Sequence, residues 1–473
     1  MVDPMLGLAA AAAALALFAW VGVRGRVRED LDDYLTARGS QPAVPLGLSF
    51  LASGLGAWIL FAPPEVGAFV GPVAVVGYAV AAASPVVAFG LLGPRLRRIV
   101  PAGHSLTGFL RLRFGRVLHT YVAAISVLYM LVFVIAELTA VGAVTAVMTG
   151  GSGAPVIVAT AAATVAYTAY AGLRASIRTD RWQAWMVVGL LGAAAVAWSS
   201  TIGDPEDALS RVEVRFDQAN LEAAATLVLA VLAANIFHQG YWQRVWAAES
   251  DRALRRGAAL GAALTVPVVA VTGLAGVLVS STGADLGRVP VPFFAPLTAL
   301  LWVVGVGVVV LGVSLVASSV DTLTNALASL VVAERPRLGM RGARLVTLAL
   351  MVPAVALALQ GWSVLRVFLI ADLLAATVAV PVVLGVWRRA TAAGAIAGAV
   401  AGLAGSVLIG LRYSGSVGGA LRQVTFPGGV PTLWPFLGAV GASTVVTVVV
   451  SLLWRRVADL DSLDARVPTL SGR

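Results

Sequence analysis

Long apolar stretches separated by short polar segments follow one another along almost the whole chain. They consist mainly of Ala, Val, Leu and Gly, and they lack the apolar–polar alternation over about ten residues that marks a strand of a membrane barrel. A helix needs about 20 apolar residues to cross roughly 30 Å of hydrocarbon, and about thirteen stretches are long enough. We therefore predict an all-α membrane protein. The predicted transmembrane helices are 3–23, 45–69, 72–94, 117–149, 154–173, 181–202, 220–242, 256–281, 293–333, 343–360, 364–387, 391–411 and 433–454.

The amino-acid composition supports this class. Hydrophobic residues make up 59% of the 473 residues and charged residues only 12%, whereas about a quarter of the residues of a soluble protein are charged. The lipid bilayer is therefore the expected surroundings of nearly the whole chain. We predict a single transmembrane domain over residues 1–473, in which residues 456–473 form a cytoplasmic tail too short for an output domain.

The distribution of positive charge predicts the orientation. The formal charge is +10 and all 33 basic residues are Arg. They gather in every second loop, beginning with Arg24, Arg26 and Arg28 and ending with Arg455 and Arg456. Because positive residues concentrate on the cytoplasmic side, we predict a plasma (inner) membrane protein with its N-terminus outside and its C-terminus cytoplasmic, and no nucleic-acid partner.

The first apolar stretch is predicted to be a retained helix. Its N-terminal flank carries Asp3 and no Arg, and the Arg cluster follows it, which is the reverse of a secretory signal peptide. The chain has no Cys, which excludes disulfides and thiolate metal sites.

A weak internal symmetry is visible after the leading helix 3–23. Five spans fall in 45–202 and five in 220–387, followed by trailing helices in 391–455. An odd number of crossings inverts the second set relative to the first. In each set the third helix is unusually long, which supports the interpretation as an inverted repeat.

The first helix of each set contains an interruption. Ser53-Gly54-Leu55-Gly56 interrupts one helix and Phe237-His238-Gln239-Gly240 the other. Unwound backbone inside a membrane exposes carbonyl groups that bind cations, and matched interruptions are typical of a transport site. Glycine that merely allows close helix packing is the alternative.

The predicted helix 293–333 carries the richest set of polar side chains. Six of them share one helical stripe, with Ser319 beside it: Ser314, Ser318, Asp321, Thr322, Asn325 and Ser329. Hydroxyl and carboxylate oxygens suit an alkali cation and suit neither zinc nor copper. Hydroxyl groups also join neighbouring helices, but that role does not account for a carboxylate at this depth.

Other intramembrane polar residues leave alternatives open. Asp180 stands near the end of a helix, where capping alone would explain it. Glu137 is either a cation or proton ligand or a protonated acid bonded to a neighbouring helix. His238 and Tyr241 fall at the second interruption, where they line a solute cavity or belong to an interfacial belt.

Four motifs, in order, resemble the sodium:solute symporter family. They are YLTARG from Tyr34, YTAYAGLRASIRTDRWQ from Tyr167, QR with AAES from Gln243, and SSVDTLTN from Ser318. The resemblance runs from about residue 30 to about 455 and implies two inverted five-helix repeats with one leading and two trailing helices.

The resemblance also implies binding sites. A sodium ion would take the backbone carbonyls of Ala52, Leu55 and Leu315 and the hydroxyls of Ser318 and Ser319. A second cation would lie at Asp180, Asp321 and Thr322. The solute and its gate would involve Ser53, Gly54, Trp58, Glu137, His238 and Tyr241. Leu315 stands where the sugar carriers have a small residue, although it still offers a carbonyl.

These features predict a secondary active transporter rather than an enzyme. The expected reaction is sodium-coupled symport of a small polar organic solute by alternating access. Polar contacts of the sugar carriers are not reproduced around Trp58, which leaves proline, another amino acid or a urea-like solute. A proton-coupled carrier on the same fold is the alternative. An intramembrane enzyme is disfavoured because no HExxH or GxSxG motif accompanies the three His residues.

Overall fold

The computed structural model describes residues 1–24, 36–201, 205–282, 291–416, 418, 433–454 and 457–467. Tyr34, Leu35, Arg26, Arg28, Arg455 and Arg456, which the sequence analysis named, lie outside the described residues. Within those residues the regular secondary structure is helical, apart from one isolated bridge between Gln41 and Ala248. The prediction of an all-α protein is confirmed for this part of the chain.

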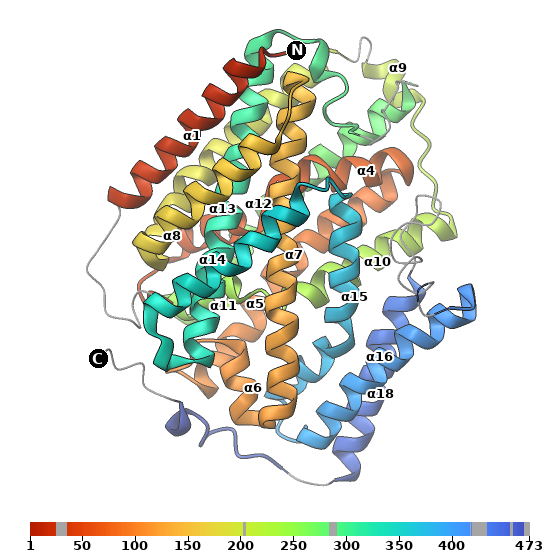
Figure 1. Cartoon of the computed structure of the whole chain (residues 1–473). Helices are drawn as coiled ribbons and strands as arrows, with labels where there is room; N and C mark the ends of the chain where they lie inside the picture. The colour runs from red at the N-terminus through yellow and green to blue at the C-terminus, as the bar shows by residue number, and fades with distance from the viewer. Residues whose placement is uncertain are drawn as a thin grey trace.

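The helices form one elongated bundle (Figure 1). Their bounds are α1 (Pro4–Arg24), α3 (Ala43–Gly54), α4 (Ala62–Phe69), α5 (Pro72–Ile99), α6 (Leu106–Phe114), α7 (Arg116–Thr149), α8 (Ala154–Ser199), α9 (Pro205–Ser210), α10 (Gln218–Asn235), α11 (Gln239–Ala247), α12 (Asp251–Ser281), α13 (Trp302–Glu334), α14 (Gly339–Ala358), α15 (Val364–Val383), α16 (Ala392–Ser414) and α18 (Trp434–Leu453). Short 3₁₀ segments include η1 (Ala57–Leu60), η2 (Leu297–Ala299) and η6 (Asp464–Arg466).

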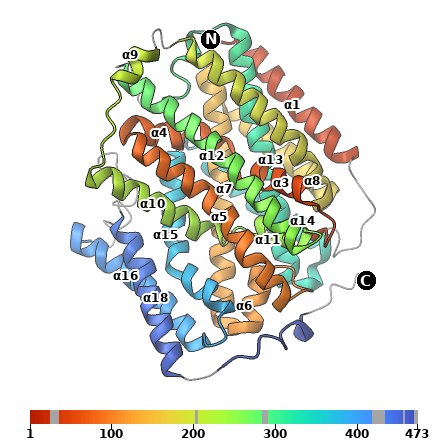
Figure 2. The ribbon, with the colours of Figure 1, turned by 180° about the vertical axis from the view of Figure 1, so that it is seen from behind.

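Among the described residues, eight helices are long and apolar enough to cross a membrane, or up to ten if each of two bent pairs counts as one span. The long helices α7 and α13 are the most deeply buried of these, and α7 runs through the middle of the bundle in Figure 1. The α16–α18 pair lies on one flank and α1 on the other, while α5 and α12 pack together on the face shown in Figure 2. The core therefore lies around α7 and α13.

Both predicted helix interruptions are confirmed. Between α3 and α4 the axis bends by 60°, and between α10 and α11 it bends by 65°. At the first break Leu55 and Gly56 adopt extended backbone, and η1 then begins at Ala57. The Glu137 carboxylate of α7 accepts the backbone N–H of Ala57 at 2.7 Å, which satisfies a donor that the break leaves without a helical partner.

Glycine is required at this first break. A Cβ on Gly56 would collide with the Glu137 carboxylate, and a Cβ on Gly54 would collide with the Tyr241 hydroxyl. The break therefore fits against α7 on one side and α11 on the other.

Three element predictions need correction. Helix α13 begins at Trp302 rather than at 293, because Pro292 and Pro296 cannot donate backbone hydrogen bonds in the segment before it. The predicted spans 154–173 and 181–202 are joined in one continuous helical element, α8, whose 46 residues are more than twice what one crossing needs; the polar stretch between them has no Gly or Pro to end the helix. The sequence analysis did not predict α6, which is short and carries Arg111 and Arg113.

Candidate functional site

The predicted sodium ligands come from the end of α3 and the middle of α13. The Ser318 hydroxyl lies 3.2 Å from the carbonyl oxygen of Ala52 and 3.1 Å from Oδ1 of Asp180. Ser319 is fully buried, and its hydroxyl has no hydrogen-bond partner among the described residues. Leu55 lies in the extended break, and Leu315 is on α13 one turn before the serines. The two elements thus bring a carbonyl and two hydroxyls into the protein interior.

Asp180 on α8 is held by a network centred on Arg244 of α11. Arg244 Nη2 donates to Oδ2 of Asp180 at 2.7 Å, and both side chains are fully buried. The same carboxylate oxygen accepts the Ser49 hydroxyl at 2.6 Å and lies 3.3 Å from that of Ser53. A buried carboxylate needs a partner of opposite charge and further hydrogen bonds, and this network supplies both.

The remaining donors of Arg244 extend this network to α13. Its Nε donates to the Ser49 hydroxyl at 2.8 Å, its Nη1 to the carbonyl of Gly240 at 2.8 Å, and its Nη2 lies 3.1 Å from Oγ1 of Thr322. We call Ser49, Ser53, Asp180, Arg244 and Thr322 the Asp180 cluster. It connects α3, α8, α11 and α13 in the centre of the bundle.

The three residues predicted for a second cation lie on α8 and α13, and all three are buried. Asp180 and Thr322 both contact Arg244. Asp321 accepts the Thr168 hydroxyl of α8 at 3.2 Å. In the sequence, Arg244 stands out only as part of the QR motif. An Arg deep inside a membrane protein is itself a signal, because it requires a buried acid nearby.

A small central cavity of about 40 Å³ adjoins the first break. Of the predicted solute and gate residues, Gly54, Trp58 and Tyr241 line this cavity. Ser53 belongs instead to the Asp180 cluster, and Glu137 caps η1. His238 stacks on Tyr241 with ring centroids 4.5 Å apart.

The cavity also contains an acid that the sequence analysis did not name. Asp372 on α15 lines it and is only 4% exposed. Its signal in the sequence is a lone carboxylate within the apolar run FLIADLLAAT, which carries the same cost as the acids that were named.

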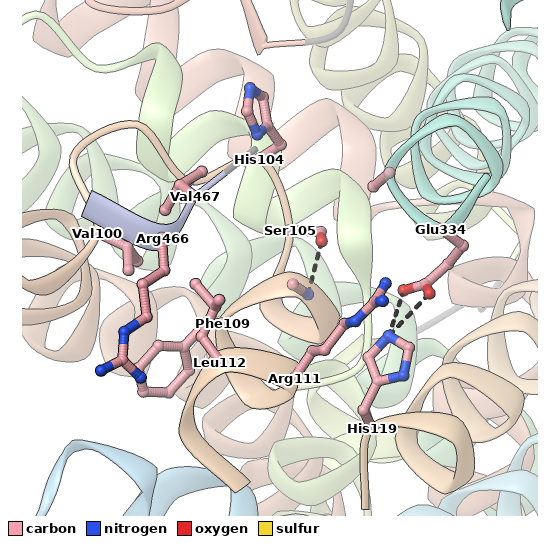
Figure 3. A pocket seen from close by; sticks show the side chains of 13 residues that line it. Val100, His104, Ser105, Phe109, Arg111, Leu112, His119, Glu334, Arg466 and Val467 are labelled. Carbon is pink, nitrogen blue, oxygen red and sulfur yellow. Dashed lines mark hydrogen bonds and ion pairs between the residues drawn. The ribbon is translucent and has the colours of Figure 1, made fainter. Parts of the chain in front are cut away.

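A larger cavity of about 320 Å³ lies at the end of the bundle that contains α6 (Figure 3). Arg111 and His119 both point toward Glu334 at the end of α13 (Figure 3), and His119 Nε2 lies 2.8 Å from that carboxylate. The segment around η6 closes one side of it, where Asp464 accepts the backbone N–H of Ala102 at 3.1 Å. None of the predicted site residues lines this cavity.

Comparisons with known proteins place this geometry in a family. The model of the sodium:solute symporter family matches residues 34–276, more than half of the chain. The spermidine transporter DUR31 of Candida albicans (strain SC5314 / ATCC MYA-2876) is 28% identical over 364 residues, which are 75% of this chain and 69% of that protein.

Solved structures show the same fold. A sodium-coupled sialic acid symporter in a substrate-bound, outward-open state superposes with a TM-score of 0.74 at 17% identity, covering 96% of this chain and 99% of the other. Mhp1, a nucleobase-cation-symport-1 family transporter, in a closed conformation with bromovinylhydantoin bound, gives a TM-score of 0.58 at 13% identity over 92% and 98% of the two chains. From the family match and this fold, the chain belongs to the sodium:solute symporter family and is an integral membrane transporter rather than an enzyme.

Proposed function

We propose that this protein carries a small polar organic solute together with sodium by alternating access. The observation that carries the proposal is the meeting of the Ser318 hydroxyl with the Ala52 carbonyl at the break of α3. Sodium would bind the carbonyls of Ala52, Leu55 and Leu315 and the hydroxyls of Ser318 and Ser319. The unpartnered Ser319 hydroxyl supports this, since a buried hydroxyl without a bond is costly unless a ligand completes it.

Sodium at this position would join the broken helix of one repeat to α13 of the other. The proposed architecture has about thirteen spans, two inverted five-helix repeats, an outer N-terminus and a cytoplasmic C-terminus in the plasma membrane. An inward sodium flow then drives solute accumulation, because the membrane potential contributes about 2.3 kcal/mol per charge per 100 mV.

A second cation at Asp180, Asp321 and Thr322 would depend on Arg244. In the present structure the positive charge beside Asp180 is the Arg244 guanidinium. A second sodium ion would therefore require a conformation in which Arg244 has moved away from this carboxylate.

The proposed solutes are proline, another amino acid or a urea-like compound. The name of the Candida albicans relative adds a polyamine, spermidine, to this range. Trp58, Gly54 and Tyr241 line the proposed solute cavity, and the His238 ring stacks on that of Tyr241.

The sodium site is tested by thermal unfolding of the purified full-length protein in sodium and in potassium buffers. Sodium should raise the unfolding temperature of the wild type, because a ligand that binds only the folded state stabilises it. The S318A/S319A double variant should lose most of this response. Ser314→Ala is the matched control, because Ser314 is a buried serine of the same helix whose hydroxyl bonds to Val310 of its own helix.

An unchanged sodium response in the double variant would refute the assignment. The proton-coupled alternative is tested in the same preparation, reconstituted into proteoliposomes. Solute uptake driven by a pH gradient in sodium-free buffer would favour it.

A further inference from the structure

Asp372 on α15 is placed to anchor a solute in the central cavity. Its side chain faces the central cavity and is nearly fully buried. Its carboxylate receives no hydrogen bond and no ion pair from any residue that the structure describes. Burying a carboxylate without a partner costs several kcal/mol, so this group is either kept neutral by a proton or completed by a ligand.

Aromatic rings line the same cavity as this carboxylate and restrict the kind of ligand. Trp58 stacks on Tyr78 with centroids 5.6 Å apart, and Phe368 packs edge-on against Trp58 at 6.4 Å and against Phe133 at 4.9 Å. All four line the cavity together with Asp372. Ring faces attract cations, most strongly where water is excluded, so the lining and the carboxylate favour the same charge.

A bare metal ion fits this lining poorly. Divalent hard cations prefer several carboxylate and carbonyl oxygens. The described lining offers one carboxylate, the amide of Asn235 and the hydroxyls of three tyrosines, and its other side chains are rings and aliphatic groups. An alkylammonium group fits better, because its N–H groups donate to the carboxylate and its methylene groups contact the rings.

A zwitterionic amino acid is disfavoured by the same lining. The described residues that line the cavity include no Arg and no His, so a solute carboxylate would have no cationic side chain to pair with. It would instead be repelled by Asp372.

We propose that the solute of this transporter is an organic amine whose alkylammonium group binds Asp372 within the aromatic cavity. The inference rests on the proposed transport function and deepens it by naming the substrate class. The cavity, at about 40 Å³, has room for such a head group alone. The rest of a longer amine enters when the cavity opens during the transport cycle.

The test measures binding to the purified full-length protein by thermal unfolding and by intrinsic tryptophan fluorescence, since Trp58 lines the cavity. The ligands are butylamine, 1,4-diaminobutane and the neutral analogue 1-butanol, with proline and urea as further neutral or zwitterionic solutes, each in sodium and in potassium buffer. Wild type should respond to the two amines and not to the other three compounds. In the D372N variant the apparent Kd for the amines should rise at least tenfold.

Two further variants keep the result interpretable. Asp372→Glu keeps the charge and should retain amine binding within about tenfold. Phe368→Leu keeps an apolar lining without the ring face and should weaken the amines severalfold without creating a response to 1-butanol. The sodium response should persist in all three variants, which shows that each is folded.

The outcomes separate this inference from the proposed function. A sodium response without an amine response in wild type would overturn the amine assignment and leave sodium coupling standing. Equal amine affinity in wild type and D372N would also overturn it, and would indicate that Asp372 is a neutral structural acid. An amine response that D372N removes, in a protein that ignores sodium, would support the amine assignment and refute sodium coupling.

Discussion

Two of the buried aspartates, Asp180 and Asp372, lie near the break that follows α3, and they differ in what surrounds them. Asp180 is bound by Arg244, Ser49 and Ser318. Asp372 faces a cavity and has no such partner among the described residues. A carboxylate that is neutralised within the protein belongs to its framework, whereas one that is not neutralised there is free to select a cation from outside.

The end of α3 and the break that follows it contribute residues to the surroundings of both aspartates. Ser49 and Ser53 of α3 contact Asp180, while Gly54 and Trp58, immediately after them, line the cavity of Asp372. A movement of α3 in the transport cycle would therefore affect the ion pair and the solute cavity together. Through this shared helix, sodium binding at Ala52 would affect the cavity in which the proposed solute binds.

The largest expected effect comes from breaking the Asp180–Arg244 pair. Arg244→Met would leave Asp180 buried without its cation, and removal of one partner of a buried pair costs about 3–5 kcal/mol. The variant should unfold at a much lower temperature, or fail to accumulate as a monodisperse protein, when followed by fluorescence-detected size-exclusion chromatography after heating.

The double variant Arg244→Met with Asp180→Asn is the control for this prediction. Removing both charges should restore much of the lost stability, since no unpaired charge remains. Equal stability of wild type and the Arg244→Met single variant would contradict the framework role of the cluster.

An intermediate effect is expected at the break itself. Gly56→Ala places a methyl group against the Glu137 carboxylate, so the hydrogen bond to Ala57 must lengthen or the helix must shift. Overpacking of this kind costs about 1–3 kcal/mol. Thermal unfolding measures the loss, and Gly189→Ala, at a glycine whose added Cβ would meet no atom within 4 Å, is the matched control with no expected penalty from crowding.

The sequence predicted most of the helices and both helix breaks, but it did not predict which buried charged residues pair. The two breaks were predicted because glycine-containing segments interrupt long apolar runs at matching positions. The start of α13 was misplaced because hydropathy outweighed Pro292 and Pro296, and α8 was divided because its polar middle resembled a loop. Both errors have the same cause: the length of an apolar run was considered without asking which backbone groups can form helical hydrogen bonds.

The contacts of the buried charges depend on residues far apart in the chain. Asp180 and Arg244 are separated by 64 positions, and no spacing rule states that they meet. Asp372 is visible in the sequence as a lone carboxylate in an apolar run, but only the packed structure shows that it shares a cavity with aromatic rings of α5, α7 and η1.

The smallest expected effect is that of Asp372→Asn, and the sharpest test of the comparison sets it beside the same substitution at Asp180. Asp372→Asn keeps the size of the side chain and removes a carboxylate that has no partner, so the ligand-free protein should be equally stable or more stable by up to about 1–2 kcal/mol. Asp180→Asn should destabilise, because Arg244 is then buried beside a neutral amide. Thermal unfolding in sodium-free buffer without solute compares the two variants directly. A loss at Asp372 as large as that at Asp180 would mean that this carboxylate is bonded within the protein, and the two environments would then be alike.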